Sequence, residues 1–416
     1  MLAVVLRNSG FARLWAAGAV SLVGDWLSFV AVASLAIGHG GDAFGLAMVF
    51  GAHALPGALL APVAGALVDG LDRRRVLIAA DAIASLVTVG MMLAALAEQL
   101  ALVSLLLLAR SAVSAVVPPG ESAAVRVLVP EPDLLAANSL LAATWSVAYV
   151  VGMALGGVAA TLGPALALGI DAASFAVAAA IHATLPALPS PAARRPVRAI
   201  LRDTPADTIA ALRVAARSRP LLRAVLGKMP LGLASGSAWV ALNLVGALST
   251  PFGSAALSFG VLQAIRGAGT GIGPLVTNHL ARRGVSERLL QGIAVALALA
   301  AMTGLAIART PLALALVCLL WGTGTGANWV LSHAALQRHS DDAVIGRLAA
   351  FDELLVTLAM VLSALAGAAL ITWIDLAAGP LAAGALGALG VTLALATVRI
   401  VGAAERPAEE SRRLRA

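Results

Sequence analysis

Twelve long apolar segments divide this 416-residue chain, and they constrain its fold more than any other feature. Crossing the hydrocarbon core of a bilayer takes about 20 largely apolar residues. Only helices and closed barrels satisfy every backbone polar group in lipid, and these segments lack the apolar–polar alternation of barrel strands. We therefore predict an all-α integral membrane protein with twelve transmembrane helices. The expected spans are residues 14–37, 46–68, 76–97, 101–117, 138–161, 164–185, 222–248, 255–280, 289–308, 311–335, 348–373 and 378–401.

The composition excludes a water-soluble fold. Hydrophobic residues make up 60% of the chain and charged residues 12%, whereas soluble domains hold about 45–50% and 25%. Cys318 is the single cysteine, so no intrachain disulfide can form. No cleavable signal precedes the first span, and we expect that helix to be retained.

The net charge of +7 reflects the orientation of the chain in the membrane. Outside the spans, Arg and Lys residues gather in alternate loops, and the opposite loops carry only Arg309. The positive-inside rule then places both termini in the cytoplasm. We expect a multi-pass protein of the bacterial cytoplasmic (inner) membrane that has the lipid bilayer, and no nucleic acid, as a partner.

The longest loop divides the chain into two six-helix halves. We assign residues 1–185 to an N-terminal bundle, 186–221 to a cytoplasmic linker, 222–403 to a C-terminal bundle and 404–416 to a cytoplasmic tail. Within the linker, the run from Thr204 to Asp207 is typical of a helix start. It predicts either a short amphipathic helix on the membrane surface or a plain connector.

A weak internal repeat supports this division. Gly65-Ala-Leu67-Val68 precedes a pair of arginines, and Gly273-Pro-Leu275-Val276 precedes another pair. Position 273 follows position 65 by 208 residues, half of the chain. Two bundles related by a parallel repeat are expected to hold a substrate cavity between them.

The segment from Gly65 to Arg75 is similar to the signature that follows helix 2 in the major facilitator superfamily. Over nearly its whole length the chain resembles the twelve-helix drug:proton antiporter branch, which includes macrolide and enterobactin exporters. The resemblance implies the major facilitator fold and a cytoplasmic gate, in which Asp69 caps helix 11 and the arginines bind acids at neighbouring helix ends. The alternative is that the arginines only set topology. The gate residues implied are Gly65, Asp69, Asp72, Arg73, Arg74, Arg75 and Asp81, with Asp81 as a partner for an arginine.

Helix 5 departs from the antiporter signature, because Met153 stands where the family has a proline. The glycines Gly152, Gly156 and Gly157 keep the small-residue spacing that allows close helix packing.

Charged residues inside the spans each need a reason, because a charge at the bilayer centre costs several kcal/mol. Asp25 lies near the midplane of helix 1 and is our first candidate for proton coupling, the alternative being a carboxylate permanently paired with an arginine. Arg110 could pair with Asp25 or bind an anionic group. Asp352 and Glu353, near the start of helix 11, are candidates for a second protonation site or for a helix-capping role.

Polar and aromatic residues inside other spans are candidates for the substrate cavity. They are Arg110, Trp145, Trp239, Asn243, Gln263, Arg266 and Asn328. Because the chain holds only seven Trp and one Tyr, we expect a cavity poor in aromatic residues. No nucleotide-binding glycine loop, His/Cys cluster or convergent catalytic group is evident, so we expect no cofactor, no metal and no enzymatic activity.

These features predict a monomeric secondary transporter that exports small amphiphilic molecules in exchange for protons by alternating access. Drugs, macrolides and siderophore-like molecules are the substrate classes that the resemblance implies. One alternative is an uptake symporter or a flippase for a lysolipid or other amphiphile with the same fold. Another is a membrane receptor or scaffold that transports nothing.

Overall fold

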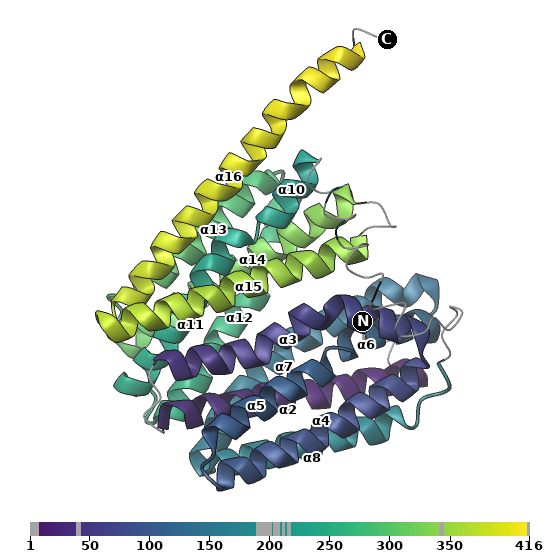
Figure 1. Cartoon of the computed structure of the whole chain (residues 1–416), viewed down its shortest axis with the longest axis vertical. Coiled ribbons are helices and arrows are strands. Elements are labelled where there is room, and N and C mark those ends of the chain that lie inside the picture. Colours follow the sequence, from purple (N-terminus) through teal and green to yellow (C-terminus); the bar gives the residue numbers. More distant parts are fainter. Residues whose placement is uncertain are drawn as a thin grey trace.

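The computed structural model describes residues 8–38, 43–188, 218–340 and 345–413, with isolated positions 202, 209 and 213. The expected amphipathic helix of the linker lies outside these ranges. The described chain is helical, and its elements form two bundles that lie side by side (Figure 1). The N-terminal bundle consists of α2 (Ser9–Gly38), α3 (Ala43–Gly70), α4 (Arg73–Leu96), α5 (Leu100–Ser114), α6 (Val117–Leu128), η1 (Glu131–Asp133), α7 (Leu134–Leu162) and α8 (Pro164–His182). The C-terminal bundle consists of α10 (Arg219–Leu226), α11 (Met229–Ser249), α12 (Ala255–Arg282), α13 (Glu287–Gly304), α14 (Pro311–His339), α15 (Ile345–Trp373) and α16 (Ala378–Arg413).

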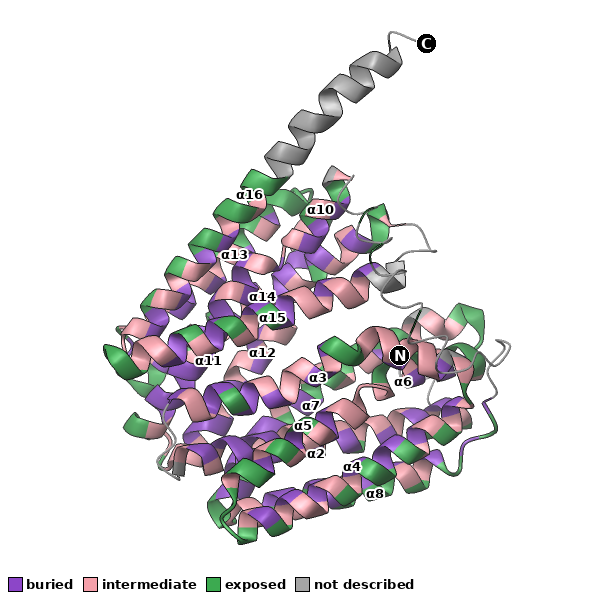
Figure 2. Cartoon of the chain, viewed as in Figure 1, coloured by how far each residue is buried: buried purple, intermediate pink, exposed green. Residues whose placement is uncertain are grey.

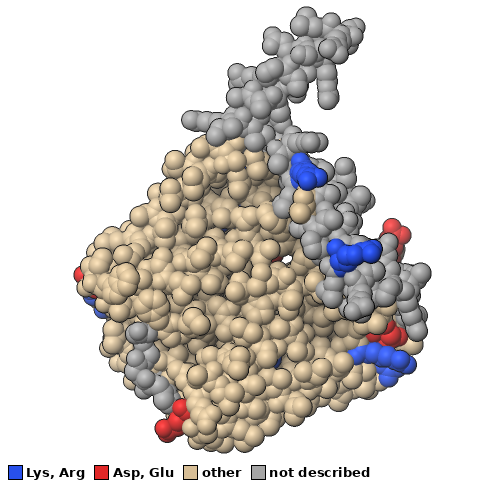
Figure 3. Space-filling model, in the orientation of Figure 1, with Lys and Arg blue, Asp and Glu red and all other residues tan. Residues whose placement is uncertain are grey.

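Among the described residues, eleven helical segments are long and apolar enough to cross a membrane. The twelfth crossing is α12, which packs among them but carries Gln263, Arg266 and Thr270 in its middle. The outer face of the molecule is apolar over a broad area, and charged side chains gather at its margins (Figure 3). Large apolar side chains such as Leu86 and Leu105 are exposed, while buried residues line the helix sides that face inward (Figure 2). The protein is a multi-pass integral membrane protein with the twelve-helix fold that the sequence predicts.

Two spans continue well beyond their predicted ends. The fourth continues to Leu128 because Pro118 and Pro119 open a new helical segment, α6, instead of ending the span. Proline is tolerated in the first turn of a helix, where its missing N–H has no partner to lose. The last helix, α16, runs on to Arg413, so most of the segment assigned to the tail is helical.

The seventh span is broken. Two turn residues, Gly227 and Lys228, separate α10 from α11, and Pro230 follows in the first turn of α11. The side-chain amide of Asn328 donates to the freed Gly227 carbonyl at 3.2 Å. Discontinuous helices of this kind in transporters mark places where polar backbone lines a site.

The bundles meet mainly where α7 packs on α12 and α3 packs on α15. Near the end of α7, a Cβ on Gly157 would stand 3.1 Å from the Ala256 carbonyl oxygen of α12. Gly152 and Gly156 bring the other side of α7 against α2, where a Cβ on Gly156 would stand 2.7 Å from the Leu27 carbonyl oxygen. The three glycines predicted to allow close packing therefore lie where α7 packs against α2 on one side and α12 on the other. Any larger side chain there would push these helices apart.

Candidate functional site

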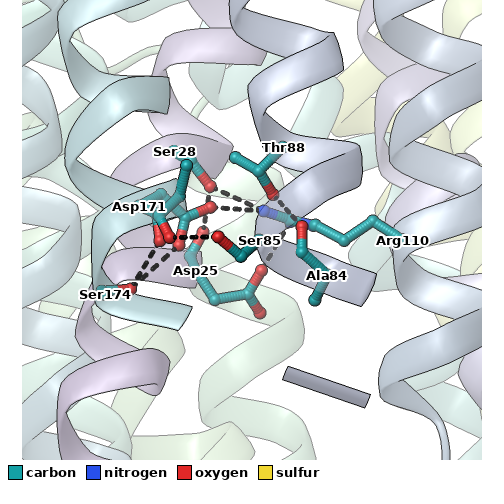
Figure 4. A network of polar contacts seen from close by, with 9 residues as sticks. Asp25, Ser28, Ala84, Ser85, Thr88, Arg110, Asp171 and Ser174 are labelled. Atoms are coloured by element: carbon teal, nitrogen blue, oxygen red, sulfur yellow. Dashed lines mark hydrogen bonds and ion pairs between the residues drawn. The ribbon is translucent and has the colours of Figure 1, made fainter. Parts of the chain in front are cut away.

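A buried ion triad lies at the centre of the N-terminal bundle, built from α2, α5 and α8 (Figure 4). Arg110 Nη2 lies 2.5 Å from Asp25 Oδ1, and Arg110 Nη1 lies 2.5 Å from Asp171 Oδ2. Nη1 also donates to the Ser28 hydroxyl at 2.9 Å. The ion pair between Asp25 and Arg110 that we considered is therefore present, and Asp171, whose partner the sequence did not reveal, completes the triad.

The triad has an uneven charge balance. One guanidinium faces two carboxylates, so the cluster carries a net charge of −1 when both carboxylates are ionised. A net charge inside a bilayer is costly, and one bound proton would remove it. The Ser174 hydroxyl also donates to the Asp171 carboxylate at 3.3 Å.

The two carboxylates differ in access. Asp171 is fully buried and Arg110 is 1% exposed, whereas the side chain of Asp25 is 26% exposed. Asp25 is therefore the more accessible of the two carboxylates.

Aromatic side chains form one continuous cluster next to the triad, between the two bundles. Trp26 follows Asp25 on α2 and packs edge-on against Tyr149 and Trp145 of α7, with ring centroids 4.7 Å and 5.9 Å apart. Phe29 of α2 reaches across to Trp239 of α11 at 5.9 Å. Phe50, His53 and Phe259 complete the cluster. These rings come together although the chain is poor in aromatic residues, and the expectation of a sparsely aromatic substrate cavity stays a prediction.

A chain of hydrogen bonds crosses from one bundle to the other beside this cluster. The Tyr149 hydroxyl of α7 donates to Gln263 Oε1 of α12 at 3.1 Å and accepts from the Arg266 guanidinium. Gln263 Nε2 donates to Asn243 Oδ1 of α11 at 2.9 Å. Of the residues predicted to line the cavity, Trp145, Trp239, Asn243, Gln263 and Arg266 come together here, and Arg110 lies in the triad behind them.

Asn328 lies elsewhere, in a second buried polar cluster within the C-terminal bundle. There Lys228 Nζ donates to Asp352 Oδ2 at 2.6 Å and to His333 Nε2 at 3.2 Å. The Trp329 ring centroid lies 4.2 Å from the same ammonium. Lys228 and Asp352 are 1% and 2% exposed, so the pair is shielded from water on every side.

The sequence prediction missed this cluster's cation. Lys228 follows a run of arginines near the start of the seventh span, and from the sequence it was counted with them as a charge that sets topology. Asp352, predicted as a coupling or capping residue, has this lysine as its partner. Glu353 follows it on α15 and is partly buried. It makes no ion pair among the side chains that the structure describes.

The predicted gate region has a different set of partners. Asp72 caps α4 by accepting from the Arg75 backbone N–H at 3.0 Å. Arg74 donates to the Ala183 carbonyl at the end of α8. Asp81 accepts from His182 Nδ1 at 2.7 Å, so its described partner is a histidine of α8 instead of an arginine.

The structure describes only some of the remaining gate residues. Arg73 is 7% exposed, and no atom lies within 4 Å of the position that a Cβ on Gly65 would take. The side chains of Asp69 and of residues 345–347 at the start of α15 lie outside the described part of the structure. The helix cap expected there stays a prediction.

The solved structures that share this fold include two transporters and a bacterial homologue of a third. The nucleoside transporter NupG superposes with a TM-score of 0.70 at 12% identity, over 94% of this chain and 98% of that chain. A POT family transporter in complex with 5-aminolevulinic acid gives 0.72 at 12% identity, over 95% and 96%. A bacterial homologue of the iron transporter ferroportin, in its inward-facing state, gives 0.67 at 16% identity, over 94% and 98%. A search among curated protein sequences gave no match.

Together with the buried ion triad, this fold defines a membrane transporter of the major facilitator superfamily. The sequence model of the family described as "Transmembrane secretion effector" matches residues 3–414. The chain belongs to that family of the superfamily.

Proposed function

We propose that this transporter exports small amphiphilic molecules, such as drugs, macrolides or siderophore-like compounds, in exchange for protons. The proposal places both termini in the cytoplasm of a bacterium and makes Asp25 the proton-coupling residue. The single observation that carries it is the Asp25–Arg110–Asp171 triad, in which one proton changes the net charge from −1 to zero. The family description, which speaks of secretion, agrees with this direction of transport.

The position of the triad gives the proton a way to act on the interface. Asp25 and Ser28 alternate along α2 with Trp26 and Phe29, which contact α7 and α11. Protonation of Asp25 weakens its hold on Arg110 and frees α2 to shift against α5. A small shift of α2 would repack the aromatic cluster between the bundles, and packed interfaces of this kind switch between discrete arrangements. Alternating access would follow from that switch.

Close packing of the bundles at one end of the helices would fit an opening toward the proposed cytoplasmic side. Near the opposite ends of the helices, Gly157 lies against Gly260 and Gly51 lies near Val361 of α15. Toward the ends that hold the termini, Gly57 and Gly65 of α3 have open space around them. In this arrangement Asp25 would exchange protons with the cytoplasm.

The test is a proton-flux measurement in everted membrane vesicles with an imposed proton gradient and a pH-sensitive dye. Lipophilic cations, macrolides, siderophores and lysolipids are added in turn to the wild type, to Asp25→Asn and to a matched control, Asp375→Asn. Asp375 is an exposed residue that caps α16 by accepting from the Ala378 N–H at 2.9 Å, a bond that asparagine can keep. We expect at least one compound to dissipate the gradient with the wild type and the control but not with Asp25→Asn.

The other outcomes would point to the alternatives. Equal responses from wild type and Asp25→Asn would retain transport and move coupling to Asp352 or Glu353. If the protein instead moved a compound into the cell along that compound's own gradient, a symporter or flippase would be indicated. Silence of the wild type across the whole panel would contradict proton-coupled export and favour a receptor or scaffold.

A further inference from the structure

Arg266 is a half-buried cation in the middle of α12, and within the described part of the chain it has no anionic partner. Arg110 pairs with two carboxylates and Lys228 with one. Arg266 instead donates from Nε to the neutral amide oxygen of Gln263 at 2.8 Å and from Nη2 to the Tyr149 hydroxyl. Among the side chains that the structure describes, no carboxylate forms an ion pair with it. A full positive charge at this depth in a membrane protein calls for a compensating anion.

Several N–H donors near Arg266 are left without partners in the described structure. Within the described residues, Arg266 Nη1 makes no hydrogen bond. Trp321, whose ring centroid is 5.2 Å from Arg266 Cζ, is 1% exposed and has an Nε1–H without a partner. Trp26, which packs on Tyr149 within the N-terminal bundle, also has a buried and unpartnered Nε1–H. Arginine and tryptophan side chains can only donate, so the missing partner is rich in acceptor atoms.

The neighbouring polar groups hold the guanidinium in place. Gln263 Nε2 is bonded to Asn243 Oδ1, which turns the Gln263 oxygen toward both Arg266 and Tyr149. The guanidinium also lies between two aromatic rings, with its Cζ 5.4 Å from the Tyr149 centroid and 5.2 Å from that of Trp321. A cation fixed in this way keeps its remaining donors in one position, which is the arrangement that binds a planar oxyanion well.

An apolar surface continues from this cation. The Trp145 ring stacks on Tyr149 with centroids 5.6 Å apart and planes inclined by 20°. Although it also contacts Trp26, Trp145 remains 45% exposed. An exposed aromatic face beside a fixed cation matches a molecule that has an anionic group at one end and a flat apolar body at the other.

We propose that Arg266 binds a carboxylate or similar oxyanion of the transported molecule, whose apolar body lies against Trp145 and Tyr149. This inference rests on the proposed transport function and narrows the substrate from amphiphiles in general to anionic or zwitterionic ones. Arg266 and Gln263 belong to the C-terminal bundle, whereas Tyr149 and Trp145 belong to the N-terminal one. A bound anion would compete with the Tyr149 hydroxyl for the guanidinium, so occupancy of the site would change the contact between the bundles.

The experiment is equilibrium dialysis of the purified protein in nanodiscs of zwitterionic lipid, with empty nanodiscs subtracted. Radiolabelled naphthaleneacetate is the probe, and unlabelled naphthaleneacetamide and naphthylethylammonium, which share its ring system, are the competitors. We expect the wild type to bind the acetate at least tenfold more tightly than either competitor. The Arg266→Gln variant should lose this preference. A second probe, radiolabelled naphthaleneacetamide, should still bind to this variant, which shows that the site remains folded.

Two further variants sharpen the result. Arg266→Lys keeps the charge but loses the guanidinium fork, and it should show an intermediate preference. Arg309→Gln removes an exposed arginine and should bind like the wild type. Equal affinity of the wild type for acetate and acetamide, absence of acetate binding, or an anion preference that survives Arg266→Gln would overturn the proposal. The assay uses no proton gradient, so failure of Asp25 as a coupling residue would leave its outcome unchanged.

Discussion

Removal of the Lys228 ammonium is expected to destabilise the protein strongly. In the Lys228→Met variant, Asp352 loses a partner at 2.6 Å inside a site where its own side chain is 2% exposed. Breaking a buried ion pair by removing one member costs about 3–5 kcal/mol, because the other charge stays buried without compensation. The contact of Lys228 with the Trp329 ring is lost as well. We therefore expect the melting temperature of the purified protein, followed by size-exclusion chromatography after heating, to fall by several degrees.

Two further variants serve as controls for this prediction. Arg338 and Glu287 form an ion pair whose side chains are 50% and 48% exposed, and exposed pairs contribute about 0–1 kcal/mol. The Arg338→Met variant should accordingly melt close to the wild type. Adding Asp352→Leu to Lys228→Met removes the orphaned charge and should recover at least half of the lost stability. A single Lys228→Met variant that melts like Arg338→Met would refute the reasoning, and so would a double variant less stable than the single one.

Three further predictions follow from packing and geometry. Gly260→Ala should lower the melting temperature, because its Cβ would stand 2.8 Å from the Gly157 Cα across the bundle interface. Gly271→Ala on the same helix meets no atom within 4 Å and should be neutral or slightly stabilising in the same melt. The Cys318 thiol, which is fully buried, should resist N-ethylmaleimide in the folded protein and react once SDS unfolds it, and rapid native labelling would contradict the packing of α14. Arg110→Lys should abolish gradient-driven transport in everted vesicles, since an ammonium lacks the fork that holds both carboxylates of the triad. Transport at the wild-type rate would show that the fork is dispensable.

The fold could be predicted from the sequence to the extent that hydropathy determines it. Long apolar runs and the one-sided distribution of arginines predict the number and direction of crossings, because lipid permits few alternatives to helices. Helix ends were less predictable. The predicted fourth span ends at residue 117, whereas the chain continues as α6 through Pro118 and Pro119. The break at Gly227 and Lys228 gave no hydropathy signal because apolar residues flank it.

The candidate site could be predicted only as a set of residue types. Asp25 and Arg110 are conspicuous as charges inside apolar runs, and this alone suggested that they interact. The identity of partners depends on how helices far apart in the chain pack, so the role of Asp171 in the triad and of His182 beside Asp81 was not foreseeable. The same limit hid the aromatic cluster, since a low overall aromatic content says nothing about where the rings gather.

The most direct test of the proton-coupling claim compares two modes of transport in proteoliposomes, with a substrate identified in the vesicle screen. One mode is uptake driven by a pH gradient, and the other is exchange of labelled for unlabelled substrate at equal pH. We predict that the wild type and Asp375→Asn perform both, whereas Asp25→Asn retains exchange and loses the gradient-driven mode. If Asp25→Asn performs both modes like the wild type, or loses both, Asp25 is not the proton-coupling residue.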